Sequence, residues 1–141
     1  MKGYLIDTNV LCEGAKRSPE PAVTAWLTGT ATEDQYVSVL TMGEVQRGVS
    51  KSASATQKRR LAEWLRDGLL REFEGRILPV DWPVAQAWAV LTSKSEAHGR
   101  TLPVIDALLA ATALVHELTV VTRNARDFDG TGVRVLNPWK E

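Results

Sequence analysis

The sequence predicts an α/β domain in which helices flank a mostly parallel central sheet of about five strands. Short apolar runs alternate with longer segments of helical periodicity along the chain. This alternation is typical of strand–helix–strand units, whose strands run in parallel and are covered on both faces. The length of 141 residues suits one domain, spanning residues 1–141.

Five short apolar segments are predicted to be strands. They cover residues 4–6, 36–39, 77–80, 118–122 and 133–136. The third contains Pro79, which cannot donate a backbone hydrogen bond and therefore indicates a strand end or an edge position in the sheet. Functional sites in such sheets lie beyond the carboxyl ends of the strands, so the residues that follow the strands are the first candidates.

The helices predicted between these strands differ in their expected burial. They cover residues 9–16, 21–28, 41–49, 55–73, 84–97 and 104–117. In the segment 55–73 apolar residues recur at helical spacing and charges fill the other face, which predicts a half-buried helix. The segment 104–117 is apolar nearly all round and follows Pro103, so we expect a buried helix that starts there.

The charge balance limits the functions that the chain can have. Lys and Arg total 17 and Asp and Glu total 17, so the formal net charge is zero. A neutral chain is a poor candidate for coating nucleic acid by bulk charge, although a local basic rim around an acidic site remains compatible with it.

Cysteine content and hydropathy indicate the compartment. Cys12 is the single cysteine, which excludes an intrachain disulfide and fits a reducing cytoplasm. The N-terminal apolar run stops at Asp7 after three residues, unlike a signal peptide. The most apolar stretch, residues 102–115, is too short to span a bilayer. We therefore expect a soluble, cytoplasmic protein without a membrane partner.

Asp106 is the most informative acid in the sequence. It lies in the first turn of the apolar segment 104–117. A carboxylate in such surroundings must be neutralised, hydrogen-bonded or bound to a cation, because an unpaired buried charge is costly. The helix dipole also favours a negative charge there. A core arginine, backbone amides or a bound cation would each account for Asp106.

Two further acids stand at strand and helix ends. Asp7 follows the first strand and, taken alone, suits the N-cap of the next helix. Glu44 lies in the segment 41–44, which matches a capping box in which Glu reaches back to the cap amide. Because the predicted fold brings these ends together with Asp106, the three acids predict a carboxylate cluster that needs a cation. Carboxylate oxygens suit Mg²⁺ or Mn²⁺, and no Cys/His cluster offers a zinc site.

The segment after the fourth strand supplies the remaining candidates. Thr122 could hydrogen-bond a carboxylate or a water, Asn124 could orient a water, and Asp127 could add a further charge. A simple turn is the alternative, because Asn and Asp are common in turns. We interpret the single histidines, His98 and His116, as surface or packing residues, and Cys12 as a small buried hydrophobe.

At these residues the chain resembles the PIN-domain family and, within it, the VapC-type toxins of bacterial toxin–antitoxin pairs, including their plasmid-stability branch. The matching segments are residues 5–11, 43–49, 103–113, 121–128 and 132–139. The resemblance implies a parallel sheet surrounded by helices, RNA hydrolysis through a water activated by Mg²⁺ or Mn²⁺, a homodimer, and inhibition by a small cognate antitoxin protein.

The resemblance also assigns roles to residues. Asp7, Glu44 and Asp106 match the family's three core acids, and they are the expected catalytic residues and metal ligands. The chain departs from the family at the fourth acid, because many relatives carry Asp two residues after the threonine, where this chain has Asn124. Either Asp127 substitutes or the fourth acid is absent, which leaves a second metal position open.

RNA and antitoxin contacts follow from the same reasoning. We expect Thr122, Arg123 and Arg126, beside the proposed site, to contact RNA. Further basic candidates are Lys16, Arg17, Arg47, Lys51 and Arg100, whereas the run 58–60 is better interpreted as a solvated helix face. We expect most of the five tryptophans in the core, with one or two lining a groove for an amphipathic helix. They are Trp26, Trp64, Trp82, Trp88 and Trp139.

Three alternatives remain at this point. A phosphotransfer or receiver-type α/β domain would need a second acid beside Asp7 and a lysine after a late strand, and we find neither. A non-catalytic PIN module that only binds RNA or a partner is opposed by the three intact acids. A DNA nuclease is the third, because the same metal chemistry cuts either polymer.

Overall fold

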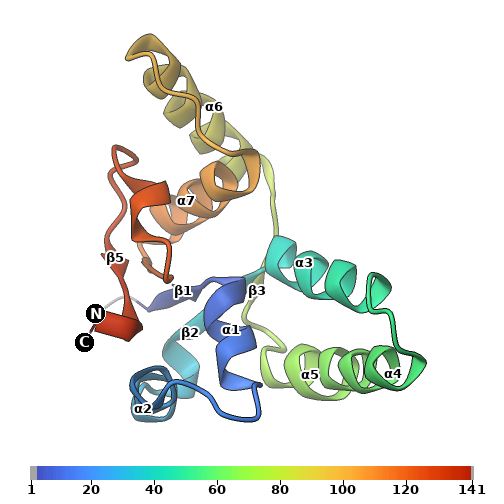
Figure 1. Ribbon diagram of the computed structural model, residues 1–141. Helices are drawn as coiled ribbons and strands as arrows, with labels where there is room; N and C mark the ends of the chain where they lie inside the picture. Colours follow the sequence, from blue (N-terminus) through green and yellow to red (C-terminus); the bar gives the residue numbers. More distant parts are fainter. Residues whose placement is uncertain (1–2, 141) are drawn as a thin grey trace.

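The computed structural model describes residues 3–140 and shows one parallel sheet packed between helices (Figure 1). Hydrogen bonds join all five strands, and each neighbouring pair is parallel. The prediction of an α/β fold with a parallel sheet of about five strands is therefore confirmed. The strands are β1 (Tyr4–Ile6), β2 (Gln35–Ser38), β3 (Ile77–Leu78), β4 (Thr119–Val121) and β5 (Val135–Leu136), in the spatial order β3-β2-β1-β4-β5.

The order of the strands reverses at β1. The chain adds β2 and β3 on one side of β1, and then returns to add β4 and β5 on the other. In parallel sheets a crevice forms beyond the carboxyl ends of the strands at such a reversal. Ile6 pairs with Val121 in the β1–β4 ladder, so the residues that follow them, Asp7 and Thr122, lie side by side at this crevice.

The helices follow the predicted pattern with shifted ends. The predicted helix 55–73 is continuous, but a π-helical turn interrupts its α-helical geometry. The longer elements are α1 (Thr8–Gly14), α2 (Pro21–Gly29), α3 (Val39–Ser50), α4 (Ala55–Glu63), the π turn η2 (Trp64–Leu69), α5 (Leu70–Glu72), α6 (Trp82–Ala97) and α7 (Val104–His116). The short 3-10 turns are η1 (Thr32–Asp34), η3 (Ala125–Phe128) and η4 (Pro138–Lys140).

Two apolar layers cover the sheet, because successive residues of a strand point to opposite faces. Ile6, Val37 and Val121 pack into a core with α1, α2, α3 and η2. Leu5 and Val120 face the other way and pack with α6, α7 and η3. Both faces are thus filled, which leaves the carboxyl edge of the sheet as the place for a polar site.

The two ends of α7 differ from the prediction of a helix buried all round. Its middle is buried, but Val104 is 62% exposed and Leu114 is 40% exposed. The reason is that α7 packs against α6, β4 and η3, so part of its surface has no neighbour. Within residues 3–140, no helix combines the length and apolarity that crossing a membrane requires.

Two predictions on individual residues have different outcomes. The edge position indicated by Pro79 is confirmed, because β3 ends just before this residue and lies at one end of the strand order. The expectation that most tryptophans are core residues is wrong, since none of the five is fully buried and Trp82 is 71% exposed. Aliphatic side chains fill the core together with Phe73 and Phe128, and Trp26, Trp64 and Trp139 pack against it.

Candidate active site

Asp7 caps a helix, as the sequence predicts, and also lies at the crevice where the site is expected. It is the N-cap of α1, and its Oδ1 accepts a hydrogen bond from the backbone N–H of Thr8 at 2.8 Å. Its Oδ2 accepts a second hydrogen bond, also 2.8 Å long, from the hydroxyl of Thr122. The carboxylate is buried and held from both sides at the β1–β4 crevice. Serving as a cap therefore does not remove Asp7 from the site.

The buried hydroxyl of Thr122 connects the loop after β4 to the loop after β1. Besides donating to Asp7, its Oγ1 accepts from the backbone N–H of Asn124 at 3.0 Å and from Nδ2 of Asn9 at 3.3 Å. The same Nδ2 lies 3.4 Å from Oδ2 of Asp7, and Oδ1 of Asn9 accepts from the backbone N–H of Arg123 at 3.2 Å. Asn9 thus ties the two loops together.

Glu44 does not form the capping box that the local sequence predicts. The N-cap of α3 is Ser38, whose side chain accepts from the backbone N–H of Leu40 at 3.0 Å, so the helix starts before Thr41. Glu44 is exposed, and its Oε1 accepts a hydrogen bond of 2.5 Å from the hydroxyl of Thr8. The tertiary contact with α1 replaces the local one, which places Glu44 beside Asp7.

Asp106 is partly buried in the first turn of α7 without a compensating partner. No hydrogen bond or salt bridge to its carboxylate occurs within residues 3–140, which rules out a core arginine from this part of the chain. The pKa of Asp106 is raised to about 6, first by burial and then by the negative charges of Asp127, Asp7 and Glu44, in that order. The negative charges of the other two predicted core acids, Asp7 and Glu44, therefore act on Asp106.

Asp127 is the candidate for the fourth acid whose charge acts on the site, although its role there stays a prediction. This residue lies on η3 and is the first of the three acids that raise the pKa of Asp106. The backbone of Asn124 donates to Thr122, and its carbonyl accepts from the backbone N–H of Asp127 at 3.0 Å. The side chain of Asn124 is exposed and makes no hydrogen bond in the described chain, so no contact yet supports its predicted catalytic role.

The residues at this edge suit a hydrated divalent ion better than a fully protein-bound one. In the stretch that the structure describes, no group of three His, Cys, Asp or Glu side chains is arranged to hold a metal ion directly. Mg²⁺ commonly keeps several waters and binds through only one or two carboxylates. The unpartnered Asp106 among other acids offers such oxygens. Direct ligation by Asp7, Glu44 and Asp106 together stays a prediction.

The basic residues predicted to contact RNA fall into three groups. Arg123 and Arg126 are exposed beside the acids, and the guanidinium of Arg123 lies 4.9 Å from the centre of the Trp139 ring. Lys16 instead forms a 2.8 Å salt bridge with Glu13, whose pKa it lowers. The remaining candidates are exposed, and no contact connects them to the acids; they are Arg17, Arg47, Lys51 and Arg100.

Two residues of the site, Thr8 and Asn9, are not among those that the sequence predicts. Their signal is position, because they follow Asp7 directly at a strand–helix junction, where polar side chains surround the capped carboxylate. The interpretation of Cys12 as buried is wrong, since this residue is exposed on α1. His98 and His116 lie at the surface, as one of the two interpretations had it.

A model of the PIN domain matches residues 4–133. The chain belongs to the PIN-domain family. Among PIN-domain relatives, it is 40% identical over 137 residues to "Toxin FitB" of Neisseria gonorrhoeae, covering 97% of this chain and 99% of the relative. It is 30% identical to "VapC ribonuclease Y4jK" of Sinorhizobium fredii, covering 96% of this chain and 97% of the relative.

Solved structures give the same result for the fold. The crystal structure of FitAcB from Neisseria gonorrhoeae superimposes with a TM-score of 0.93 at 40% identity, covering 98% of this chain and 99% of that one. A toxin–antitoxin complex from Klebsiella pneumoniae superimposes with a TM-score of 0.70 at 26% identity, covering 96% and 98%. This PIN domain is therefore similar over nearly its whole length to proteins named as toxins and ribonucleases.

Proposed function

We propose that this PIN-domain protein is a Mg²⁺- or Mn²⁺-dependent endoribonuclease and the toxin component of a toxin–antitoxin pair. The observation that carries the proposal is the unpartnered, partly buried carboxylate of Asp106 in the field of Asp127, Asp7 and Glu44. A cluster of this kind destabilises a fold unless a cation neutralises it. The names of the relatives, which include a VapC ribonuclease, support RNA as the polymer.

Each residue of the site has a defined part in this proposal. Asp7, Glu44 and Asp106 would hold the ion, directly or through water, and Asp127 would add the fourth negative charge. When bound, the ion would activate a water and stabilise negative charge on the phosphate. Hydrolysis by in-line attack of water leaves a 5′-phosphate and a 3′-hydroxyl.

Neighbouring polar side chains hold two of these acids in place. Thr122 and Asn9 fix the orientation of the Asp7 carboxylate, and Thr8 fixes that of Glu44. Hydrogen bonds of this kind orient metal-binding carboxylates in other proteins. The proposal therefore extends the site beyond the acids themselves.

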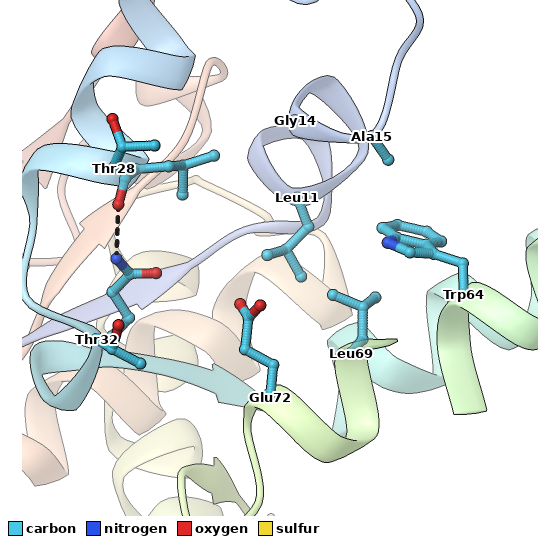
Figure 2. A pocket seen from close by; sticks show the side chains of 10 residues that line it. Leu11, Gly14, Ala15, Thr28, Thr32, Trp64, Leu69 and Glu72 are labelled. Carbon is cyan, nitrogen blue, oxygen red and sulfur yellow. Dashed lines mark hydrogen bonds between the residues drawn. The ribbon is translucent and has the colours of Figure 1, made fainter. Parts of the chain in front are cut away.

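The antitoxin partner has a candidate surface in the groove of Figure 2, where Leu11 of α1 and Trp64 and Leu69 of η2 turn toward a common space. The pocket has a volume of about 380 Å³, and a second pocket of about 390 Å³ shares Ala15 and Trp64 with it. Trp64 lines both pockets and is the tryptophan best placed to contact a docked helix. We propose that an amphipathic antitoxin segment docks there.

A homodimer and a cytoplasmic location remain predictions. Exposed apolar side chains on α6 and α7 offer a surface on which two copies of the chain would pair. They are Val90, Val104, Leu114 and Val115. Sedimentation of the purified protein tests the dimer directly. The prediction of a reducing compartment rests on Cys12, which as the single cysteine cannot form an intrachain disulfide.

A digest of two polymers tests the proposed function. Purified protein is incubated with single-stranded RNA and with single-stranded DNA of the same sequence, each with Mg²⁺, with Mn²⁺ or with EDTA. We expect metal-dependent cleavage of the RNA to 5′-phosphate ends. Preferred cleavage of DNA would favour the DNA nuclease alternative, and absence of cleavage with a folded protein would favour a binding module.

A further inference from the structure

A surface cleft lies next to the acidic site. It has a volume of about 520 Å³ and runs between η3 and η4. Two of its residues, Asn124 and Asp127, are also candidates for the acidic site. A polymer that presents a bond to the acids would therefore pass this cleft. The cleft is lined by Arg123, Asn124, Ala125, Arg126, Asp127, Asp129, Asn137 and Lys140.

Three cations of the cleft are free to meet an anion. Arg123, Arg126 and Lys140 are exposed, and none forms a salt bridge with an acid within residues 3–140. The cleft also contains Asp129 and Asp127, but the charge of Asp127 acts on Asp106 in the acidic site. Unpaired cations at the margin of an acidic centre suit a phosphate backbone.

The cleft also contains a flat surface for stacking. The guanidinium of Arg123 lies over the half-buried ring of Trp139, 4.9 Å from the ring centre. Asn137 holds both partners, because its Nδ2 donates to the carbonyl of Arg123 at 3.3 Å and its Oδ1 accepts from the backbone N–H of Trp139 at 2.9 Å. A base of single-stranded RNA can stack on the outer face of such a guanidinium.

The stacking surface is attached to the acids through the backbone. The N–H of Arg123 donates to Oδ1 of Asn9, and Nδ2 of Asn9 contacts both Thr122 and Asp7. Asn9 therefore holds both Arg123 in the cleft and the Asp7 carboxylate. A nucleotide bound in the cleft would lie at a fixed position relative to the acids.

We infer that this cleft binds one nucleotide next to the scissile phosphate of single-stranded RNA. Its base stacks on Arg123, and its phosphate is held by Arg126 and Lys140. The inference rests on the proposed RNA hydrolysis and adds to it the surface that selects a single strand, because only an unpaired base can turn onto the guanidinium.

RNA binding in EDTA tests the phosphate contacts. The probe is a labelled single-stranded RNA of about ten nucleotides with mixed sequence, whose anisotropy is followed over a range of salt concentrations. Arg126→Ala and Lys140→Ala should each weaken binding at low salt and lower the slope of log affinity against log salt by about one. Arg71→Ala is the matched control, since Arg71 is exposed on α5, which lies on a different side of the molecule from β5 (Figure 1).

A second comparison tests the stacking. Arg123→Lys keeps the charge but removes the planar group, so its salt slope should stay unchanged. Its preference for the RNA over an abasic oligonucleotide of equal length should fall by about fivefold or more. Thermal unfolding confirms that each variant is folded.

Cleavage assays with Mg²⁺ separate this inference from the proposed function. If Arg126→Ala and Lys140→Ala bind and cut RNA like Arg71→Ala, the cleft is not the nucleotide site, although the nuclease proposal stands. If the unmodified protein neither binds nor cuts RNA, both proposals fail. Selective loss of binding in the cleft variants, with cutting retained at high RNA concentration, supports the inference.

Discussion

The hydroxyl of Thr122 donates a 2.8 Å hydrogen bond to Oδ2 of Asp7, which lies 115 positions earlier in the chain. The contact follows directly from the pairing of Ile6 with Val121, one residue back on each strand. Central strands of the sheet thus fix the geometry of the first acid. The stability and the activity that we expect of the site depend largely on such contacts between loops.

Replacing Thr122 by Val should weaken both stability and activity. Valine keeps the shape but leaves three buried or partly buried groups without their hydroxyl partner: Oδ2 of Asp7, Nδ2 of Asn9 and the N–H of Asn124. We expect a loss of about 1–3 kcal/mol in the free energy of unfolding, measured with urea. Thr122→Ser is the matched control, and equal stability of the Val and Ser variants would contradict the assignment.

The pKa of Asp106 makes a prediction about pH. Because the folded-state pKa, about 6, lies above the ordinary value of 3.8, this carboxyl favours folding most when it is protonated. Its contribution is complete below the unfolded pKa and is lost as pH rises through 6. In EDTA, Asp106→Asn should therefore be more stable than the unmodified protein at pH 7.5 and should lose that advantage near pH 4.

The magnitude of this effect is modest, because solvent reaches part of the carboxylate. We expect about 1 kcal/mol after screening, measured by urea unfolding at the two pH values. Asp129→Asn, which removes an exposed acid that is not among the causes of the shift, is the control. A destabilised Asp106→Asn protein at pH 7.5 would mean that the carboxylate has a partner that stabilises it.

Divalent metal should stabilise the protein through the same acid. A ligand that binds only the folded state adds about 1.4 kcal/mol at ten times its Kd. Titration with Mg²⁺ or Mn²⁺ should raise the Tm of the unmodified protein. The rise should be much smaller in Asp106→Asn, whereas Asp129→Asn should respond normally. An equal rise in all three proteins would place the bound ion elsewhere.

The contact between Thr8 and Glu44 should matter for activity more than for stability. Glu44 is exposed, so Thr8→Val should change the free energy of unfolding by only about 0.5 kcal/mol. Losing a hydrogen bond that orients a metal-binding carboxylate typically reduces activity or metal affinity by about 10- to 100-fold. RNA cleavage at several Mg²⁺ concentrations measures this, with Thr8→Ser expected to retain activity. Unchanged cleavage by Thr8→Val would show that Glu44 needs no support.

The five strands could be read from the sequence because each is a short apolar run. The position of Asp7 at the sheet edge followed from the same pattern. Glu44 shows where local reasoning fails, since residues 41–44 match a capping box while Ser38 caps the helix and Thr8 takes the carboxylate. A contact with another helix outweighed the local signal.

The fourth acid could not be placed from the sequence for a related reason. Asn124 and Asp127 lie in an irregular loop, where no periodicity indicates the direction of a side chain. The short η3 turn brings the charge of Asp127 close enough to act on Asp106, while Asn124 contributes its backbone N–H to Thr122. The π turn at Trp64 is similar, because apolar spacing predicts a helix there without showing the extra residue in its turn.

RNA cleavage by Asp106→Asn beside the unmodified protein tests the central claim most directly. Both proteins are first shown to be folded by cooperative unfolding and matching circular dichroism, and are then incubated with RNA and Mg²⁺. A cation held among Asp7, Glu44 and Asp106 requires that the folded Asn variant lose cleavage. Cleavage at the full rate by the folded Asp106→Asn protein would contradict the account.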